Sequence, residues 1–579
     1  MNIFIHMSHS IFRWNPLAKS TYIMQDIFNI QEYLEQVKTY INGVCKGREP
    51  WEIILITLLT ISACYLVNRI ISNLLDDGIK ATFWYYFRKL PFIKQTVEKK
   101  IKATTDVIEK ELLKGVENKI FLQSLPKKSW NVNNILKEID NYISFGKFSW
   151  TDGFVSGAFY PGNDETLEDL MQQVYRKTAY TNPLHPDVFP GIRIMEAEIV
   201  HIVSTLFNAP EGIGTVTTGG TESIFLVCKA YRDYARHEKG IKEPNMVIPV
   251  TAHAAFDKAA QLLKIRVKHV KYDSDSMKVN IRAMKRVIDR NTCMLVGSAP
   301  AFPHGCIDDI EEIAKLGLKY DVPVHVDCCL GGFLVPFMKK AGFQLPPFDF
   351  SVNGVTSISC DTHKYAFAPK GTSVILYKHK IHRHYQFSVT TDWPGGIYGT
   401  PNLSGSRSGG LIATCWASLL YHGETGYVES TKKIITVTRY IEKGLKEIDG
   451  IFVFGQPNVS VIAVGSNVFD VYRLSSALTE KGWNLNILQF PPGFHICVTM
   501  QHTYPGVADK FISHVKECTA VILKDPVSCT TGTAAIYGMA QQIPDRSLVG
   551  EIVWAYLDAC YSIKKNEPLE NGTTKEIKS

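Results

Sequence analysis

The chain lacks the features that mark several classes of protein. Its 13 cysteines are an odd and scattered set with no CxxC pair, which argues against a disulfide framework or a zinc site and is typical of a reducing compartment. The formal net charge of +7 over 579 residues is too mild to indicate a nucleic-acid-binding surface. A basic start followed by an apolar core, as in a signal peptide, is absent near the N-terminus. We therefore expect no metal centre and no nucleic-acid partner.

Long apolar runs are also scarce, with one exception between Trp51 and Ile71. This run carries no charge from Ile53 to Val67. It is slightly shorter than the ~20 apolar residues of a membrane helix, but the flanking Trp51 and Tyr65 are typical of membrane interfaces. We predict a transmembrane helix over residues 51–71, with a buried core helix as the alternative.

Basic residues around this run predict its orientation. The near flank before it holds Lys38, Lys46 and Arg48. More positive charge follows it, at Arg69, Lys80, Arg88, Lys89, Lys94, Lys99, Lys100 and Lys102. Because cytosolic flanks carry the excess of Lys and Arg, residues 1–50 are predicted to be lumenal and the rest cytosolic. Residues 72–129 are predicted to form a basic membrane-proximal linker, whose aromatic part lies at the membrane surface or is a solvated helix.

A chain of 579 residues is long enough for several domains, and from residue 130 the pattern becomes globular. Short apolar runs predict strands at 246–250, 267–271, 293–297, 322–327, 355–360 and 372–377. Helical patterns lie between several of them, at 254–264, 280–290 and 308–320. This alternation predicts parallel βαβ units and a large α/β domain over residues 130–430.

The order of elements changes after residue 430. Helical patterns at 431–448, 468–482 and 506–524 alternate with strand patterns at 451–455, 460–465, 484–488 and 494–500. We predict a smaller α+β domain over residues 431–562. Residues 563–579 are polar and charged, which predicts a disordered tail.

One lysine stands at a position typical of ligand sites in α/β proteins. Lys364 lies in SISCDTHKYAFAPKG (357–371), directly after the apolar run 355–360, where a strand's carboxyl end is expected. In a partly dry pocket the amine is expected to lose its charge and to attack a carbonyl. Such a lysine is the usual anchor of pyridoxal phosphate, as a Schiff base. A surface lysine is the alternative.

The segment GTVTTGGTES (214–223) precedes a helical run. Backbone N–H groups of Gly219, Gly220 and Thr221 would point at an anion, and the helix dipole would assist. This pattern predicts a phosphate cradle. An ordinary loop-to-helix cap has the same composition.

Two further polar residues follow predicted strands. Asp327 ends the strand 322–327, where a carboxylate can keep a pyridinium nitrogen protonated; a turn cap is the alternative. His253 follows the strand 246–250, where its ring can stack on a cofactor; a helix cap is the alternative. Carboxyl ends of strands in one sheet share an edge, so Asp327, His253, Lys364 and the glycine loop can reach one crevice.

These motifs resemble a known family. Together with NPLHPDVFPG (182–191), VDCCLGGF (326–333) and YGTPNLSGSR (398–407), they are similar to the group II branch of fold-type I pyridoxal phosphate enzymes, and most of all to the sphingosine-1-phosphate lyases. The similarity covers roughly residues 130–560 and extends to the N-terminal membrane segment. It implies an aspartate-aminotransferase-like fold and a homodimer with two active sites near the subunit interface. It also implies the endoplasmic reticulum membrane, with the enzyme domain in the cytosol.

The resemblance implies an aldehyde-lyase that uses pyridoxal phosphate. It would cleave the C2–C3 bond of sphingosine 1-phosphate and other sphingoid base phosphates by a retro-aldol step, giving a long-chain aldehyde and phosphoethanolamine. Lys364 would hold the cofactor, Asp327 would keep its ring nitrogen protonated and His253 would stack on the ring. The cofactor phosphate would be held by Gly219, Gly220, Thr221 and His363.

The resemblance also implies a site for the substrate phosphate, formed by His185, Lys370 and Tyr160. Tyr398 would deprotonate or orient the substrate hydroxyl, and Arg407 is a candidate for the interface or phosphate region. An amino-acid decarboxylase of the same superfamily is the alternative, although it needs neither a membrane span nor Lys370. A catalytically dead membrane scaffold would be expected to have lost Lys364 or Asp327, and both are present.

Overall fold

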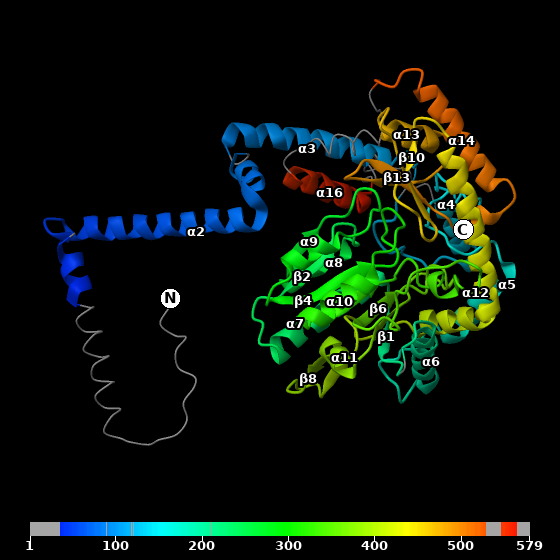
Figure 1. The fold of residues 1–579 in the computed structure, drawn as a ribbon, viewed down its shortest axis with the longest axis horizontal. Coiled ribbons are helices and arrows are strands. Elements are labelled where there is room, and N and C mark those ends of the chain that lie inside the picture. Colours follow the sequence, from blue (N-terminus) through cyan, green and yellow to red (C-terminus); the bar gives the residue numbers. More distant parts are fainter. Residues whose placement is uncertain are drawn as a thin grey trace. The chain divides into compact units, whose positions relative to one another are not determined.

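The computed structural model in Figure 1 describes residues 35–43, 45–87, 90–116, 119, 121–209, 211–528 and 546–563. The chain forms two compact units, one from Met1–Phe121 with Ile543–Ser579 and the other from Leu122–Gln542. Most of the predicted lumenal segment and nearly all of the predicted disordered tail lie outside the described residues. Each unit is described by itself below.

The described residues of the first unit include the long helices α2 (Pro50–Phe87), α3 (Pro91–Leu112) and α16 (Arg546–Cys560). Helices α2 and α3 both begin with a proline, which fits the first helical position because its missing N–H has no partner there. Helix α16 packs on α3, and Ser562 donates a hydrogen bond to Glu109.

The predicted membrane span lies within α2. Residues Pro50–Asn68 form a helix long and apolar enough to cross a membrane, and none of that stretch is buried. A buried core helix, the alternative, is therefore not what the structure shows. Helix α2 continues to Phe87, so the predicted linker begins as a helix.

A seven-stranded sheet forms the centre of the second unit, in the order β1-β7-β6-β5-β4-β2-β3. Its strands are β1 (Gly214–Thr217), β2 (Asn245–Pro249), β3 (Arg266–Val270), β4 (Thr292–Ser298), β5 (Val324–Asp327), β6 (Val355–Cys360) and β7 (Ser373–Tyr377). Six of the seven agree with the predicted strands. The four residues of β1 were not predicted, because the run is short and merges with the glycine loop.

The expectation of parallel strands is wrong for β7. This strand is antiparallel to both of its neighbours, β6 and β1, whereas the other neighbouring pairs are parallel. A parallel pair needs a crossover, usually through a helix. The connection from β6 to β7, residues 361–372, contains no helix and turns straight back.

Helices cover both faces of the sheet. Helices α7 (Gly220–Glu238) and α8 (Ala255–Leu263) pack on one face, together with Met246 and Ile248 of β2. Val247, which points the other way because strand side chains alternate, belongs to the core that includes α6 (Pro190–Leu206) and α10 (Ile310–Tyr320). A sheet buried on both faces explains why its strands are apolar runs without alternation.

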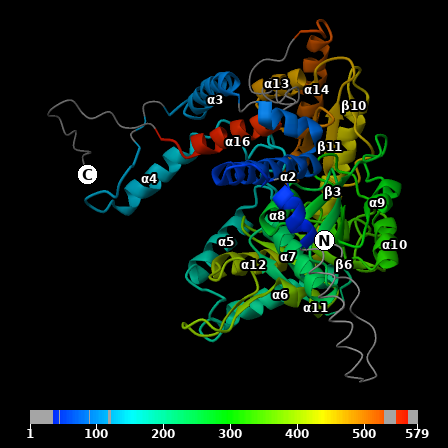
Figure 2. The same ribbon diagram turned by 90° about the vertical axis from the view of Figure 1, so that its left-hand side faces the viewer.

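A second, smaller sheet follows in the order β10-β11-β13-β12, with every pair antiparallel. It consists of β10 (Phe452–Val453), β11 (Val461–Gly465), β12 (Asn486–Leu488) and β13 (Gly493–Cys497). Helices α13 (Val471–Glu480) and α14 (Val507–Ile522) accompany it (Figure 2).

Helix α12 (Gly409–Lys446) runs across the predicted domain boundary at residue 430. It kinks at Gly423, whose φ of 54° is in the left-handed region that glycine tolerates. Residues of both sheets belong to one hydrophobic core. The division into residues 130–430 and 431–562 therefore stays a prediction.

The remaining described elements are short or peripheral. They are α4 (Val132–Ile143), α5 (Glu165–Thr178), α9 (Ile281–Val287), η1 (Val335–Phe337), α11 (Lys380–Gln386), β8 (Ser388–Thr390), β9 (Tyr398–Thr400) and η2 (Met500–Thr503).

Candidate active site

Lys364 lies in the turn that joins β6 to β7. Its Nζ is 2.9 Å from Oδ2 of Asp361, and the side chains of the two residues are 22% and 3% exposed. The turn is closed by the Phe367 N–H, which donates to the Lys364 carbonyl at 3.0 Å. The antiparallel return of the chain thus places the amine and a buried carboxylate side by side at the end of β6.

This ion pair decides the charge of the amine. Burial is the largest influence on Lys364 and lowers its pKa, but the negative charge of Asp361, followed by Tyr160 and Cys329, raises the pKa above its ordinary value. Burial likewise works to raise the pKa of Asp361, and Lys364 holds it below its ordinary value. The expectation that the amine loses its charge is wrong for this arrangement, because a carboxylate three residues earlier offsets the desolvation.

The predicted phosphate cradle meets the lysine turn. A Cβ added at Gly220 would lie 2.7 Å from Sγ of Cys329 and 2.9 Å from Oδ1 of Asp361. A Cβ added at Gly219 would lie 3.4 Å from Cε1 of His363. Only a glycine at position 220 allows the start of α7 to come this close to Cys329 and Asp361. The glycine loop, the segment after β5 and the lysine turn therefore meet because this residue has no side chain.

The atoms at this junction fit pyridoxal phosphate. Among the described residues, Oδ1 of Asp361 and Nδ1 of His363 are buried without a hydrogen-bond partner. The first N–H groups of α7, including that of the exposed Thr221, have no acceptor within the helix, and the dipole favours an anion there. A phosphate, a reactive aldehyde and a ring nitrogen match this helix end, Lys364 and the strand-end Asp327 respectively.

Asp327 is fixed at the end of β5. It is 7% exposed, and its Oδ1 accepts hydrogen bonds from the Cys329 N–H at 3.0 Å and from the Ser359 hydroxyl at 3.3 Å. The same hydroxyl lies 3.2 Å from Nε2 of His325, whose pKa burial lowers to about 4, so that this ring is neutral. Ser359 of β6 is the register partner of Asp327 of β5. Asp327 therefore lies at the end of the strand next to the one that Lys364 follows.

Two of the predicted substrate-phosphate residues also lie at the lysine turn. Nζ of Lys370 is 4.6 Å from the centre of the Tyr160 ring and 3.4 Å from the His363 carbonyl. Tyr160 is 5% exposed and packs edge-on against Tyr365. Burial, and next the charge of Lys364, lower the pKa of Lys370.

Three other predicted residues are exposed and have no hydrogen bond or ion pair with the lysine turn in the described part of the chain. Nδ1 of His253 accepts the Ala255 N–H at 3.1 Å at the start of α8. This is the helix-cap role that the sequence offered as the alternative to cofactor stacking. His185 is exposed in the turn before α6. Tyr398, at the start of β9, is 38% exposed.

The segments that carry His185 and Tyr398 contact each other. The side-chain carbonyl of Asn182 accepts the Arg407 N–H at 3.2 Å, and its amide donates to the Ser406 hydroxyl at 3.0 Å. The Arg407 guanidinium, proposed for the interface or phosphate region, forms a partly buried ion pair with Glu196 of α6. It therefore fixes the segment to α6.

Asp361 was quoted in the motif but given no role from the sequence. Its position three residues before Lys364 was the available signal, because a turn brings residues i and i+3 together. Whether that turn exists depends on the direction of β7, which the alternation of strands and helices did not indicate.

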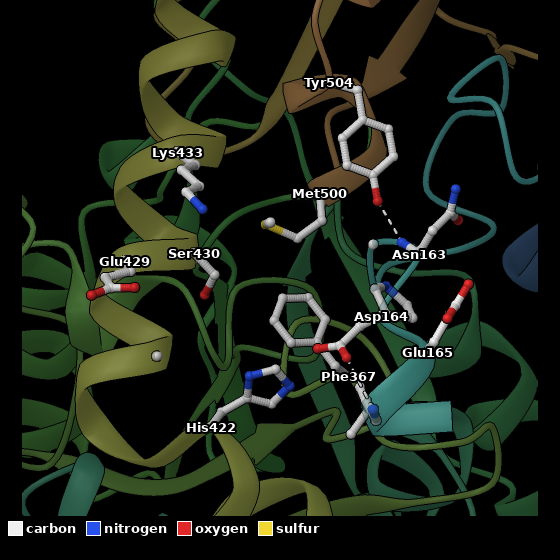
Figure 3. Close-up of a pocket in the computed structure, with 14 residues that line it drawn as sticks. Asn163, Asp164, Glu165, Phe367, His422, Glu429, Ser430, Lys433, Met500 and Tyr504 are labelled. Atoms are coloured by element: carbon white, nitrogen blue, oxygen red, sulfur yellow. Dashed lines mark hydrogen bonds between the residues drawn. The ribbon is translucent and has the colours of Figure 1, made fainter. Parts of the chain in front are cut away.

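A separate cavity of about 590 Å³ lies beyond Phe367. Figure 3 shows Asn163, Asp164 and Tyr504 on one side of it and Lys433 of α12 on the other. It is lined by none of the predicted site residues.

Comparison with known proteins identifies the family. Residues 116–464 match the model described as the pyridoxal-dependent decarboxylase conserved domain. The sphingosine-1-phosphate lyase of Drosophila melanogaster is 51% identical over 92% of this chain and 98% of its own. Sphingosine-1-phosphate lyase 1 of Rattus norvegicus is 48% identical over 94% of this chain and 95% of its own. The chain belongs to the sphingosine-1-phosphate lyase family.

Solved structures agree with this assignment. The sphingosine-1-phosphate lyase of Burkholderia pseudomallei has a TM-score of 0.69 at 34% identity, over 76% of this chain and 98% of its own. The glutamate decarboxylase of Lactobacillus brevis has a TM-score of 0.61 at 21% identity, over 72% of this chain and 98% of its own. At this identity the likeness shows the fold alone. The predicted family, fold class and pyridoxal phosphate cofactor are confirmed, and the decarboxylases are distant relatives.

Replacing Asp361 with Asn tests the ion pair. The variant removes the charge that keeps the Lys364 amine protonated, so the pKa of the amine falls and its neutral, attacking form is present at lower pH. We expect the pH midpoint for capture of pyridoxal phosphate, followed by the Schiff-base absorbance of protein stripped of cofactor, to move to lower pH.

A matched control is Glu312→Gln, which removes an exposed carboxylate that pairs with Lys315. Its pH midpoint should equal that of the wild type. An unchanged midpoint in Asp361→Asn would show that the pair does not set the charge of the amine.

Proposed function

We propose that this chain cleaves the C2–C3 bond of sphingosine 1-phosphate, and of other sphingoid base phosphates, to a long-chain aldehyde and phosphoethanolamine. The reaction is a retro-aldol cleavage by an aldehyde-lyase in sphingolipid catabolism. The observation that carries the proposal is the junction of Lys364, Asp361 and Gly220, at which an amine, a helix N-terminus and a strand-end carboxylate meet in a member of this family.

Pyridoxal phosphate supplies an electron sink for the carbon–carbon cleavage when it is bound. Lys364 holds the cofactor and carries a proton at Nζ that it shares with Asp361. Asp327, fixed by the Cys329 N–H and the Ser359 hydroxyl, holds a proton on the ring nitrogen. The first turn of α7, with His363 beside it, binds the cofactor phosphate.

The substrate phosphate binds beside the lysine turn. Lys370 provides a point charge for it, and Tyr160 provides both a hydroxyl and the ring over which Lys370 lies. His185 adds a further donor, and Tyr398 orients the substrate hydroxyl. His253, which follows β2, would supply a ring on which the cofactor could stack.

An amino-acid decarboxylase remains the second candidate in chemical terms, because the same electron sink serves both reactions. A decarboxylase of small soluble substrates needs no cation beside the site. The Lys370 amine over the Tyr160 ring favours a phosphorylated substrate.

Replacing Lys364 with Ala tests the proposed chemistry. The variant lacks the only amine that this mechanism uses to anchor the cofactor, so we expect it to lose both the Schiff-base absorbance and the release of aldehyde from sphingosine 1-phosphate. Retained turnover would contradict the mechanism, and carbon dioxide released from an amino acid by the wild type would favour the decarboxylase.

Lys370→Ala is the contrasting variant in the same experiment. It leaves Lys364 and Asp361 in place, so the Schiff-base absorbance should persist. KM for the phosphorylated substrate should rise at least about tenfold, because the variant loses a charge-assisted contact of the usual strength. Loss of the absorbance in Lys370→Ala would place this lysine at the cofactor instead.

We also propose that the chain is a homodimer with two active sites near the subunit interface. The residues around Tyr398 are apolar and exposed in the single chain: Val389 is 65% exposed, Ile397 84% and Leu403 57%. A cluster of this kind on a site-bearing segment is typical of a surface that a partner covers. Detergent-solubilised protein should sediment as two chains, and sedimentation as one chain would contradict the proposal.

The span in α2 supports residence in a bilayer, which we propose to be the endoplasmic reticulum membrane, crossed once. The N-terminal segment is then lumenal and the catalytic unit cytosolic. A substrate alkyl chain partitions into lipid at ~0.8 kcal/mol per methylene, so an anchored enzyme meets a high local concentration. In sealed microsomes, protease should destroy the Lys364 region and spare an N-terminal tag; the reverse pattern would contradict this topology.

A further inference from the structure

Glu222 is a buried carboxylate in the first turn of α7. It is 7% exposed, and its Oε2 accepts hydrogen bonds from the backbone N–H and the hydroxyl of Thr218, each at 2.7 Å. Its Oε1 accepts the Leu403 N–H at 3.1 Å. One side chain therefore joins the predicted phosphate cradle to the segment 398–407.

The donors around Glu222 are all neutral groups. A buried charge is costly unless it is hydrogen-bonded, and three donors together with the positive end of the helix dipole offset that cost. Bonds to a charged acceptor are stronger than bonds between neutral groups. Glu222 is thus a connector with a defined geometry, in contrast to an exposed ion pair that tolerates rearrangement.

Two further side chains hold the same segment against β1. The Asn402 amide donates to the Val216 carbonyl at 2.7 Å. The Gln386 amide donates to the Pro401 carbonyl at 2.6 Å and to the Thr215 hydroxyl at 2.8 Å. The segment that begins at Tyr398 therefore depends on the strand and the loop that form the cradle.

We propose that Glu222 is a positioning residue that transmits occupancy of the cofactor-phosphate cradle to the segment 398–407. The inference rests on the proposed function, because the ligand of the cradle is taken to be the cofactor phosphate. A phosphate that binds the first N–H groups of α7 orders Thr218 and its neighbours, and the two bonds from Thr218 to Glu222 pass this order to Leu403. Cofactor binding then sets the position of Tyr398 before substrate arrives.

Hydrogen exchange of the full-length protein in detergent tests the coupling. In the wild type, pyridoxal phosphate should slow amide exchange in residues 398–407. In Glu222→Ala the segment should exchange about tenfold faster, the cost of one to two hydrogen bonds, and should no longer respond to the cofactor. Glu222→Gln retains one amide oxygen as an acceptor and should give an intermediate rate.

Glu238→Gln is the matched control, since it changes an exposed carboxylate at the other end of α7, where Tyr385 is its donor. Exchange of residues 398–407 should be as in the wild type. If Glu222→Ala fails to fold, Leu403→Pro leaves Glu222 in place but removes the donor N–H of this connection, and it should also abolish the cofactor response.

Wild-type exchange rates of residues 398–407 in both variants, or an undiminished cofactor response, would overturn the proposal. Equal exchange rates of residues 398–407 in the wild type with and without pyridoxal phosphate would overturn it as well. Failure of the proposed reaction shows separately, as absence of aldehyde from sphingosine 1-phosphate, and does not alter the exchange measurement.

Discussion

The buried ion pair between Lys364 and Asp361 is the contact on which the arrangement of the site depends. Two charges removed from water are stable only if their mutual attraction and hydrogen bonding offset the cost of desolvation. The distance of 2.9 Å and the near-complete burial of Asp361 meet that condition. The start of α7 closes over the pair because Gly220 has no side chain that would collide with Asp361 or Cys329. Amine, carboxylate and helix N-terminus are therefore held as one rigid group.

The direction of β7 makes this packing possible. Strands β1 and β6 flank β7 and are both antiparallel to it, so their carboxyl ends lie at the same edge of the sheet. Lys364 follows β6 and the glycine loop follows β1, and the two meet at that edge although about 140 residues separate them in the sequence. Asp327 ends the next strand, β5, at the same edge.

The predicted site residues fall into two groups with different physical settings. Tyr160 and Lys370 are packed beside the lysine turn, so their positions are set within one chain. His185 and Tyr398 lie on exposed segments that contact each other through Asn182 and its neighbours. Glu222 connects the segment that carries Tyr398 to the loop before α7, through Leu403 and Thr218.

The sequence by itself determined the strand-end motifs, six of the seven strands of the large sheet, the single apolar span and the cofactor. These follow from local patterns, because apolar runs, glycines and a lysine after a strand are legible without knowing what packs against them. The tertiary structure alone decided the rest. The antiparallel β7 and the bond of Glu222 to Leu403 depend on residues that only the fold brings together. Asp361 lies three residues before Lys364, but the turn that pairs them depends on the direction of β7, which no local pattern in the chain encodes.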